Sequence, residues 1–273
     1  MVFELPSPED DGLYKEVVGS WSADKHHFLR RYIDAFTTAM KNKPWAGLHY
    51  VDLFCGPGIV EIKDGPLDWG SPLIAAQSPN QFTRLHLCDK KTKNIDALNK
   101  RLELYSQPNR PQVVTGDSNI LVGQIISEIP TDALTLAFLD PHGLHLEFDT
   151  VKTLSDRRAD LIIFFPDHLD ALRNWEYVYK ETPDSNLTKV LGRDNWLEIM
   201  SEVSNDRWAE VLQNMYIEQI ASLGYRFFED ERIAMPNGRF LYKLIFCTRH
   251  ELAAKLWRGT SKRHRDGQGR LFE

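Results

Sequence analysis

Residues 48–58 read LHYVDLFCGPG, and this stretch decides the fold. Its short apolar run is typical of a buried strand, and the glycines that follow permit a tight turn and close approach of the backbone to a ligand. One acid, Asp52, lies inside the strand, four residues before Gly56. A buried acid is costly unless something pairs with it. Asp52 therefore either braces the loop or binds a cationic group of a ligand.

Strand-like runs and helical patterns alternate along the rest of the chain. We expect strands at 48–52, 84–88, 112–115, 135–139 and 160–165. We expect helices at 21–40, from Ser71 onward, and at 94–104, 120–129 and 148–154. Two last strands, 226–234 and 239–248, are joined by Pro-Asn-Gly, a strong hairpin signal, and a helix follows at 250–257. This alternation predicts an α/β fold with a mostly parallel seven-stranded sheet, an antiparallel C-terminal hairpin and helices on both faces.

The pattern indicates one domain with two atypical ends. We expect residues 1–20 to form a flexible acidic N-terminal segment and residues 21–258 to form the domain. Residues 168–222 are polar, rich in tryptophan and helical by pattern, and form a helical section within the domain. Its best helix begins at Asp206, and Gly224 is placed to end it. Residues 259–273 form a basic C-terminal tail.

Composition narrows the classes of protein. The chain has 273 residues, 42% of them hydrophobic, which suffices for a core. It has no apolar run long enough to cross a bilayer and no signal peptide, so we expect a cytoplasmic protein without membrane contact. Three cysteines without paired spacing exclude a disulfide scaffold and a CxxC zinc site.

Charge is distributed unevenly. The net charge of −6 argues against coating by nucleic acid. Residues 25–49 nevertheless hold five basic side chains against one acid, and residues 255–270 hold six against one. These segments either face a polyanion such as nucleic acid or are solvated helix faces and a frayed tail.

Acids follow two further strands. Asp89 ends one strand, where a carboxylate can hold a ribose diol, and Asp117 with Ser118 follows the next. Each alone is commonly a turn residue. Three acids at successive strand ends beside a glycine turn favour a ligand site at that edge of the sheet, because open parallel sheets bind ligands there.

The sharpest motif is FLDPHGL at 138–144. Asp140 and Pro141 offer a carboxylate and a backbone carbonyl, two acceptors able to bind both hydrogens of one amine, and His142 can stack on a base or take a proton. The alternative is a plain Asp-Pro turn. A metal cluster of Asp140, His142, His145 and Glu147 has the spacing of no recognised site, so we predict no metal.

Several motifs together resemble one family. RRYIDAFTTAM, YVDLFCGPG, WGSPLIA, GDSN, FLDPHGL and DLIIFFP, spread over residues 21–257, resemble the three-Cys-motif partner (TcmP) proteins, and their order is similar to that of class I S-adenosylmethionine-dependent methyltransferases. The resemblance implies a bacterial protein with a Rossmann-like methyltransferase fold, S-adenosylmethionine as cofactor, and a radical-SAM-like three-Cys-motif protein as partner. The cysteines of the family name belong to that partner.

The resemblance also assigns roles to residues. Catalysis falls to Asp140, Pro141 and His142, although His142 stands where amino-methyltransferases usually have Pro or Phe. The implied cofactor-binding residues are Asp52, Phe54, Gly56, Gly58, Asp89, Asp117, Ser118 and Asp140.

The expected function is that of an enzyme. The Asp-Pro-x-Gly element is similar to that of tRNA guanine-N2 methyltransferases, and the glycine-loop insertion to that of an rRNA adenine-N6 methyltransferase family. We therefore expect a methyltransferase that N-methylates an exocyclic amine on a nucleic-acid base. The alternatives are a catalytically silent SAM- or nucleotide-binding accessory of the three-Cys-motif partner, and a methyltransferase acting on protein or a small molecule.

Overall fold

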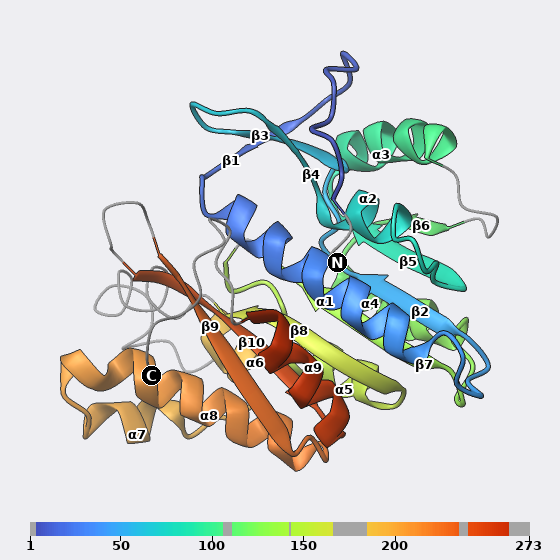
Figure 1. Cartoon of the computed structure of the whole chain (residues 1–273). Coiled ribbons are helices and arrows are strands. Elements are labelled where there is room, and N and C mark those ends of the chain that lie inside the picture. Colours follow the sequence, from blue (N-terminus) through green and yellow to red (C-terminus); the bar gives the residue numbers. More distant parts are fainter. Residues whose placement is uncertain (1–3, 106–110, 142, 166–184, 235–239, 262–273) are drawn as a thin grey trace.

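A seven-stranded sheet with helices on both faces forms the centre of the computed structural model (Figure 1). The structure describes residues 4–105, 111–141, 143–165, 185–234 and 240–261. The strand order is β6-β5-β2-β7-β8-β10-β9. The strands are β2 (Leu48–Asp52), β5 (Arg84–Asp89), β6 (Gln112–Thr115), β7 (Leu134–Leu139), β8 (Arg158–Phe165), β9 (Phe227–Ala234) and β10 (Phe240–Thr248). The predicted mostly parallel sheet with its antiparallel C-terminal hairpin is confirmed.

The register places the carboxyl ends of three neighbouring strands together. β2 is parallel to β5 and to β7, and Asp52 lies opposite Leu87 on one side and Phe138 on the other. β10 runs antiparallel to both β8 and β9. The acids that follow β2, β5 and β7 therefore meet at one edge, as expected of a parallel sheet.

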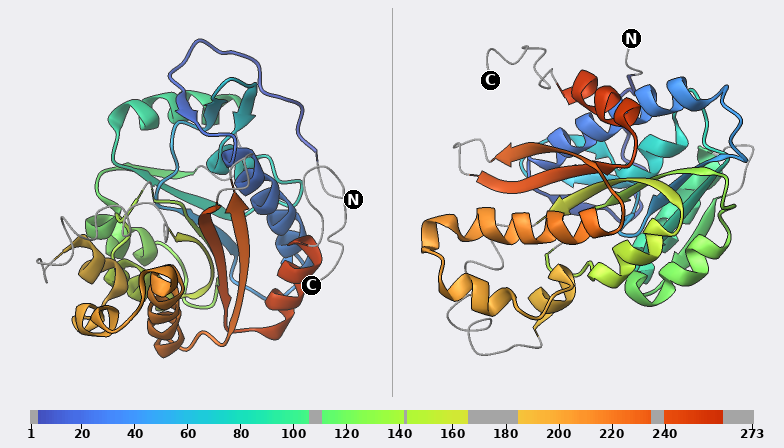
Figure 2. Two further views of the ribbon diagram at one scale, coloured as in Figure 1. Left: turned by 90° about the vertical axis from the view of Figure 1, so that its left-hand side faces the viewer. Right: turned by 90° about the horizontal axis from the view of Figure 1, so that it is seen from below.

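Alternate side chains of each strand enter two separate cores. Tyr50 belongs to one core and its neighbour Val51 to the other. The first core is covered by α1 (Ser22–Met40), α2 (Ser71–Ala76), α3 (Thr92–Leu104) and α9 (Glu251–Ser261). The second is covered by α4 (Ser118–Ser127), α5 (Phe148–Ser155), α6 (Asn186–Leu191), α7 (Trp196–Ser201) and α8 (Trp208–Ser222). The resulting three layers are visible in Figure 2.

A second, smaller sheet departs from the prediction. Its order is β1-β3-β4, with β1 (Glu16–Val18), β3 (Ile59–Ile62) and β4 (Leu67–Trp69). The insertion after the glycine turn forms the β3–β4 hairpin, and Asp64 in its turn has a positive φ of 57°. β1 pairs in parallel with β3. Strands of three or four residues are too short for their alternation to be recognised in the sequence.

The helix boundaries agree closely with the sequence. Trp21 occupies the N-cap of α1 and makes no side-chain cap hydrogen bond. Gly70 is the N-cap of α2, and the side chain of Ser71, the first residue of the helix, hydrogen-bonds to Asp52. The helix expected from Asp206 opens with a short 3-10 turn, η2 (Asn205–Arg207). Gly224 has a φ of +90° after α8, which confirms it as the stop.

The N-terminal segment packs against the domain instead of extending freely. Asp11 forms an ion pair with the fully buried Arg101, and the carbonyl of Pro6 accepts a hydrogen bond from Trp69. Glu16 likewise pairs with Lys91, so two acids of the segment have cationic partners elsewhere in the domain. The division of the chain at residues 20 and 258 stays a prediction. Within the described residues, no helix combines the length and the apolarity that a membrane span requires.

A buried acid in β8 makes stability depend on pH. Burial raises the pKa of Asp160 from 3.8 to about 6, against hydrogen bonds from Thr248 and Tyr32 that lower it. The unfolded chain loses this proton near pH 4 and the folded protein only near pH 6, so the free energy of unfolding falls as pH rises through that window. As pH rises from 4 to 7, the wild type should lose about 2 to 3 kcal/mol of its free energy of unfolding. Asp160→Asn should not show this loss.

Urea unfolding at several pH values measures this effect. The exposed Asp132 supplies the matched control, Asp132→Asn, whose stability should follow the wild type at every pH. Parallel pH profiles for Asp160→Asn and the wild type would contradict the assignment.

Candidate functional site

A cavity of about 450 Å³ opens at the carboxyl ends of β2, β5 and β6. Four of the predicted cofactor-binding residues line it: Phe54, Asp89, Asp117 and Ser118. The other residues around it are Glu16, Leu53, Lys90, Lys91, Asn94, Gly116, Asn119, Leu144, His145, Glu147, Asn186 and Lys189. We call this the strand-end cavity. Its volume lies within the ~300–1,000 Å³ range of small-molecule sites.

The glycine turn after β2 requires its glycines for two reasons. Gly56 and Gly58 have positive φ values of 62° and 89°, which disfavour other residues. A Cβ on Gly58 would lie 2.9 Å from Cδ1 of Leu98 and 3.0 Å from Cδ1 of Leu73. A Cβ on Gly56 would meet only Glu16, at 3.9 Å from Oε2. Gly58 therefore allows close packing against α2 and α3, whereas a Cβ on Gly56 would approach only Glu16, a residue that lines the cavity.

Asp52 lies behind this turn and is fully buried. Its carboxylate accepts hydrogen bonds from the backbone N–H of Phe54 at 3.2 Å and the hydroxyl of Tyr50 at 3.3 Å. The pKa of Asp52 is raised to about 7, chiefly by burial and also by the nearby charge of Asp140, against hydrogen bonds from Ser71, Phe54 and Tyr50 that lower it. Asp52 thus does brace the loop, and it is poised between its neutral and ionised forms near neutral pH.

Asp89 is held by three N–H groups. The backbone N–H of Gly56 donates to Oδ2 at 2.9 Å, that of Lys91 donates to Oδ1 at 2.7 Å, and the side chain of Asn94 donates to Oδ2 at 3.1 Å. Asp89 as a whole is 9% exposed and lines the strand-end cavity. Its carboxylate therefore ties β5 to the glycine turn at the wall of that cavity.

Asp117 forms the N-cap of α4. Its carboxylate accepts from the backbone N–H of Asn119 at 3.0 Å and from Lys90 Nζ at 3.1 Å. Partial burial raises the pKa of Asp117, but the hydrogen bonds from Lys90 and Asn119 outweigh it and lower the pKa overall. Asp117 is thus an ionised acceptor at the cavity wall, and Ser118 beside it is the first residue of the helix.

A second cavity, of about 270 Å³, lies beside the carboxyl end of β7. Asp140, Pro141, Lys25 and Phe164 line it together with Val17, Val18, Gly19, Trp21 and Ser22. We call it the Asp140 cavity. His142, expected to be catalytic, lies outside the described residues. Asp140 thus faces a different cavity from Phe54, Asp89, Asp117 and Ser118, whereas Asp52, Gly56 and Gly58 line neither cavity.

Lys25 is the partner of Asp140, and the sequence analysis missed it. Its Nζ lies 2.5 Å from Asp140 Oδ2 and 4.4 Å from the ring centroid of Phe164. Lys25 is 4% exposed and falls on the same face of α1 as Phe28, Leu29 and Tyr32. The sequence does contain a signal for this pair, because Lys25 falls among the apolar positions of one helix face. A lysine buried there needs an anionic partner. Lys25 was instead counted as one of the basic side chains of residues 25–49.

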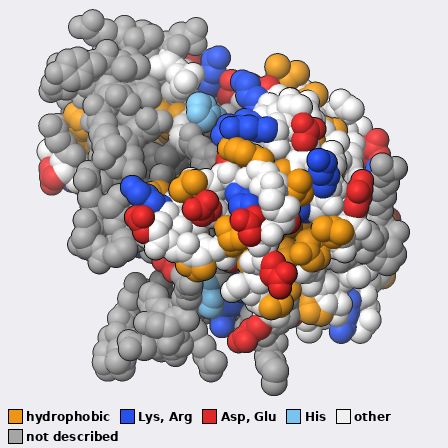
Figure 3. All heavy atoms as spheres, turned by 90° about the horizontal axis from the view of Figure 1, so that it is seen from above, with side chains coloured by type: hydrophobic (Ala, Val, Ile, Leu, Met, Phe, Trp, Pro, Cys, Tyr) orange, Lys and Arg blue, Asp and Glu red, His pale blue; other side chains and the backbone are white. Residues whose placement is uncertain are grey.

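Few described cations of the two basic segments remain open to a polyanion. Arg30 lies 3.9 Å from Asp68, Lys255 pairs with Glu251 at 2.9 Å, and Arg258 pairs with Glu229 at 3.1 Å. Lys41 and Lys43 are exposed, whereas residues 262–270 lie outside the described chain. Charges of both signs are interspersed over the face in Figure 3.

The candidate metal ligands of the Asp140 motif do not line a common cavity. His145 and Glu147 line the strand-end cavity, whereas Asp140 lines the other. Over the described part of the chain, no three His, Cys, Asp or Glu side chains are grouped as a metal site would need. Burial also raises the pKa of the Cys88 thiol to about 12, and Cys55 and Cys247 are buried as well.

Comparison with known proteins rests on structure. No protein-family model matches the sequence, and no curated protein matches it significantly. Protein LPL1258 from Legionella pneumophila, family model DUF519, is 11% identical; the alignment covers 90% of this chain and 94% of that chain, with a TM-score of 0.53. A putative O-methyltransferase from Klebsiella pneumoniae is 11% identical, with 88% and 84% covered and a TM-score of 0.49.

A third similar structure is the O-methyltransferase from Bacillus cereus in complex with SAH. It is 13% identical, with 82% of this chain and 80% of that chain covered and a TM-score of 0.48. The likeness to LPL1258 shows a shared fold.

Proposed function

We propose that the chain is an S-adenosylmethionine-dependent methyltransferase that N-methylates an exocyclic amine on a nucleic-acid base, and that it is of the TcmP type. The observation that carries the proposal is Asp140, whose carboxylate lines its own cavity at the end of β7, next to the strand-end cavity. An acceptor cavity beside a cofactor cavity is the arrangement that transfer between two molecules requires.

The strand-end cavity suits the cofactor. Phe54 and Leu53 supply apolar wall, whereas Asp89 and Asp117 supply carboxylates at positions suited to a ribose diol and an adenine amine. Gly56 leaves the turn open for close approach of the ligand. S-adenosylmethionine would supply an activated methyl group that a nucleophilic nitrogen can take.

Asp140 is placed to orient the acceptor. An ionised carboxylate only accepts hydrogen bonds, so Asp140 binds an N–H of the incoming amine and aligns its nitrogen. A nitrogen that took the methyl carbon from sulfur would release S-adenosylhomocysteine and would have to lose a proton, which the same carboxylate could accept. Lys25 balances the charge of Asp140 before the amine arrives.

The ion pair also suits the edge of a base. In adenine, cytosine and guanine the exocyclic amine is next to a ring nitrogen that accepts a hydrogen bond. Asp140 offers an acceptor and Lys25 a donor within the same cavity, so together they match such a donor–acceptor edge. Trp21 and Phe164 add aromatic surface on which a planar ring can pack.

Transfer of radiolabelled methyl groups tests the proposal. Label from S-adenosylmethionine should enter the RNA or DNA fraction of a cell extract. Entry into protein or metabolite fractions alone would replace the nucleic-acid substrate by another acceptor. Binding of S-adenosylmethionine without transfer to any fraction would favour a silent accessory of a three-Cys-motif protein.

Asp140→Ala should abolish methyl transfer while leaving the affinity for S-adenosylhomocysteine within severalfold. The interaction acts mainly in the transition state, so the loss should appear in kcat. The single change removes the anionic partner of the buried Lys25 and should destabilise the fold. The double variant Lys25→Met/Asp140→Ala is therefore the better-folded form to assay.

Thermal melting of the single and double variants serves as the control for folding. Stability should recover in the double variant, and transfer should not. Full activity in Asp140→Ala would contradict the catalytic assignment of Asp140.

The basic tail is the proposed contact to the nucleic-acid backbone. Charge reversal at Lys262, Arg263 and Arg265 should weaken substrate binding and flatten its salt dependence. Each lost phosphate contact lowers the slope of log K against log salt by roughly 0.7–0.9. Binding titrations across salt concentrations measure this slope, and Lys100→Glu on the exposed side of α3 is a matched control. An unchanged slope would mean that the tail is only solvated.

A further inference from the structure

The N-terminal strand β1 lies between the two cavities. Glu16 lines the strand-end cavity, whereas Val17 and Val18 line the Asp140 cavity together with Gly19 and Trp21. The segment that precedes α1 thus contributes walls to both.

Glu16 points its carboxylate to the glycine turn. Oε1 accepts from Lys91 Nζ at 2.6 Å and from Asn94 Nδ2 at 3.3 Å, and the side chain is 12% exposed. Oε2 is the atom nearest to the position of a Cβ on Gly56, at 3.9 Å. Glu16 therefore lies next to Gly56 of the turn and also lines the strand-end cavity.

The same two residues also hold Asp89. The backbone N–H of Lys91 donates to Asp89 Oδ1, and Asn94 Nδ2 donates to Asp89 Oδ2. Asn94 is 1% exposed, lines the cavity, and its Oδ1 has no hydrogen-bond partner among the described residues. Lys91 and Asn94 thus hydrogen-bond to the carboxylates of both Glu16 and Asp89. The Oδ1 atom of Asn94 lies in the same place as a further acceptor.

Asp89 alone has little capacity left for a diol. Its two oxygens offer about four acceptor positions, and three N–H groups already occupy three of them. A vicinal diol presents two O–H donors. A second carboxylate is needed to bind both, and Glu16 is the carboxylate in place.

We propose that Glu16 binds the ribose diol of the cofactor together with Asp89, which makes the N-terminal segment a part of the cofactor site. This assignment rests on the proposed function. Glu16 belongs to β1 of the smaller sheet, far along the chain from Asp89. The cofactor site would therefore include a residue that does not lie at a strand end of the main sheet.

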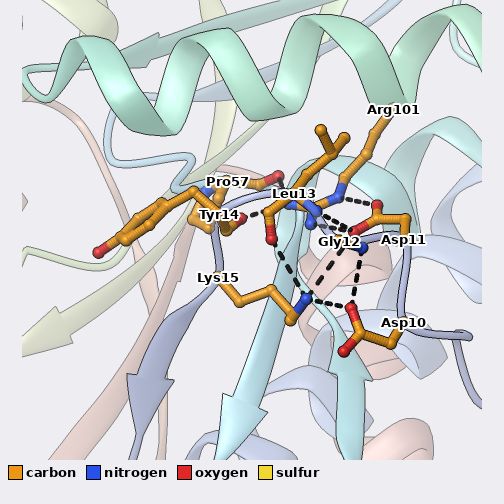
Figure 4. A network of polar contacts seen from close by, with 8 residues as sticks. All are labelled: Asp10, Asp11, Gly12, Leu13, Tyr14, Lys15, Pro57 and Arg101. Atoms are coloured by element: carbon orange, nitrogen blue, oxygen red, sulfur yellow. Dashed lines mark hydrogen bonds and ion pairs between the residues drawn. The ribbon is translucent and has the colours of Figure 1, made fainter.

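Arg101 fastens this segment to the same turn (Figure 4). Its guanidinium, 0% exposed, donates from Nε and a terminal nitrogen to the two oxygens of Asp11 at 2.7 and 2.9 Å. The other terminal nitrogen donates to the carbonyl of Tyr14 at 3.0 Å and to that of Pro57 at 2.6 Å. Pro57 lies between Gly56 and Gly58, so one side chain of α3 joins the N-terminal segment to the glycine turn.

Cofactor binding and docking of the segment are therefore coupled. Breaking the Asp11–Arg101 pair loosens Glu16 and weakens cofactor binding from outside the cavity. By reciprocity, bound cofactor holds the segment in place.

Calorimetric titration of the full chain with S-adenosylhomocysteine tests the ligand assignment. Glu16→Gln, which keeps the size of the side chain, should weaken binding by about tenfold, as expected for loss of a charge-assisted hydrogen bond. Glu61→Gln on the neighbouring β3, where the side chain is exposed, is the matched control and should bind as the wild type.

Competition by adenosine and 2′,3′-dideoxyadenosine shows whether the ribose is the group recognised. The wild type should bind adenosine more tightly than 2′,3′-dideoxyadenosine. Glu16→Gln should reduce the difference between the two affinities. An equal loss for both nucleosides, or unchanged affinity for S-adenosylhomocysteine, would overturn the assignment. If the wild type itself does not bind S-adenosylhomocysteine, the proposed function fails instead.

Hydrogen exchange tests the coupling. Saturating S-adenosylhomocysteine should slow amide exchange across residues 11–18 of the wild type. Asp11→Asn should speed exchange there and weaken binding severalfold, whereas Asp10→Asn, at a side chain that is 67% exposed, should do neither. Fast exchange in Asp11→Asn with undiminished affinity would show that the segment docks independently of the cofactor.

Discussion

The structure depends on a hydrogen-bonding or ionic partner for each carboxylate at the carboxyl ends of the parallel strands. These carboxylates lie close together at one edge of the sheet. Each acid there is satisfied differently. Asp52 is buried among neutral donors, Asp89 is bound by N–H groups, Asp117 caps a helix beside a lysine, and Asp140 pairs with Lys25. Unpaired carboxylates this close would repel one another and resist burial. The different partners keep the fold intact and leave each acid with a different chemical capacity.

Arg101 extends this pairing beyond the sheet. A fully buried guanidinium needs several acceptors, and here they come from two parts of the chain. The requirement fixes the path of the N-terminal segment, because only that path brings Asp11 and the carbonyl of Tyr14 to the same place. Once the segment follows it, β1 can pair with β3 and add three residues to a sheet that borders both cavities.

The sequence predicted the parts of the molecule that local pattern determines. β6 and the stop at Gly224 agree with the prediction, and the carboxyl-end acids were recognised because acids after strands recur at fixed places in such sheets. Lys25, Glu16 and Arg101 were missed as site residues. Lys25 meets Asp140 across 115 positions, and Arg101 meets Asp11 across 90. Contacts at such separations come from tertiary packing, so no local spacing reveals them.

Lys25 also restricts what can enter the Asp140 cavity. A protein lysine would bring a second ammonium to a carboxylate that already holds one, at 2.5 Å, in a wall where Lys25 is 4% exposed. That approach requires either displacement of Lys25 or two like charges side by side, and both are costly when solvent is excluded. A neutral aromatic amine brings no charge and can accept a hydrogen bond from Lys25 through its ring nitrogen. Under the proposed function, the ion pair therefore disfavours a protonated amine and suits the neutral amine of a base.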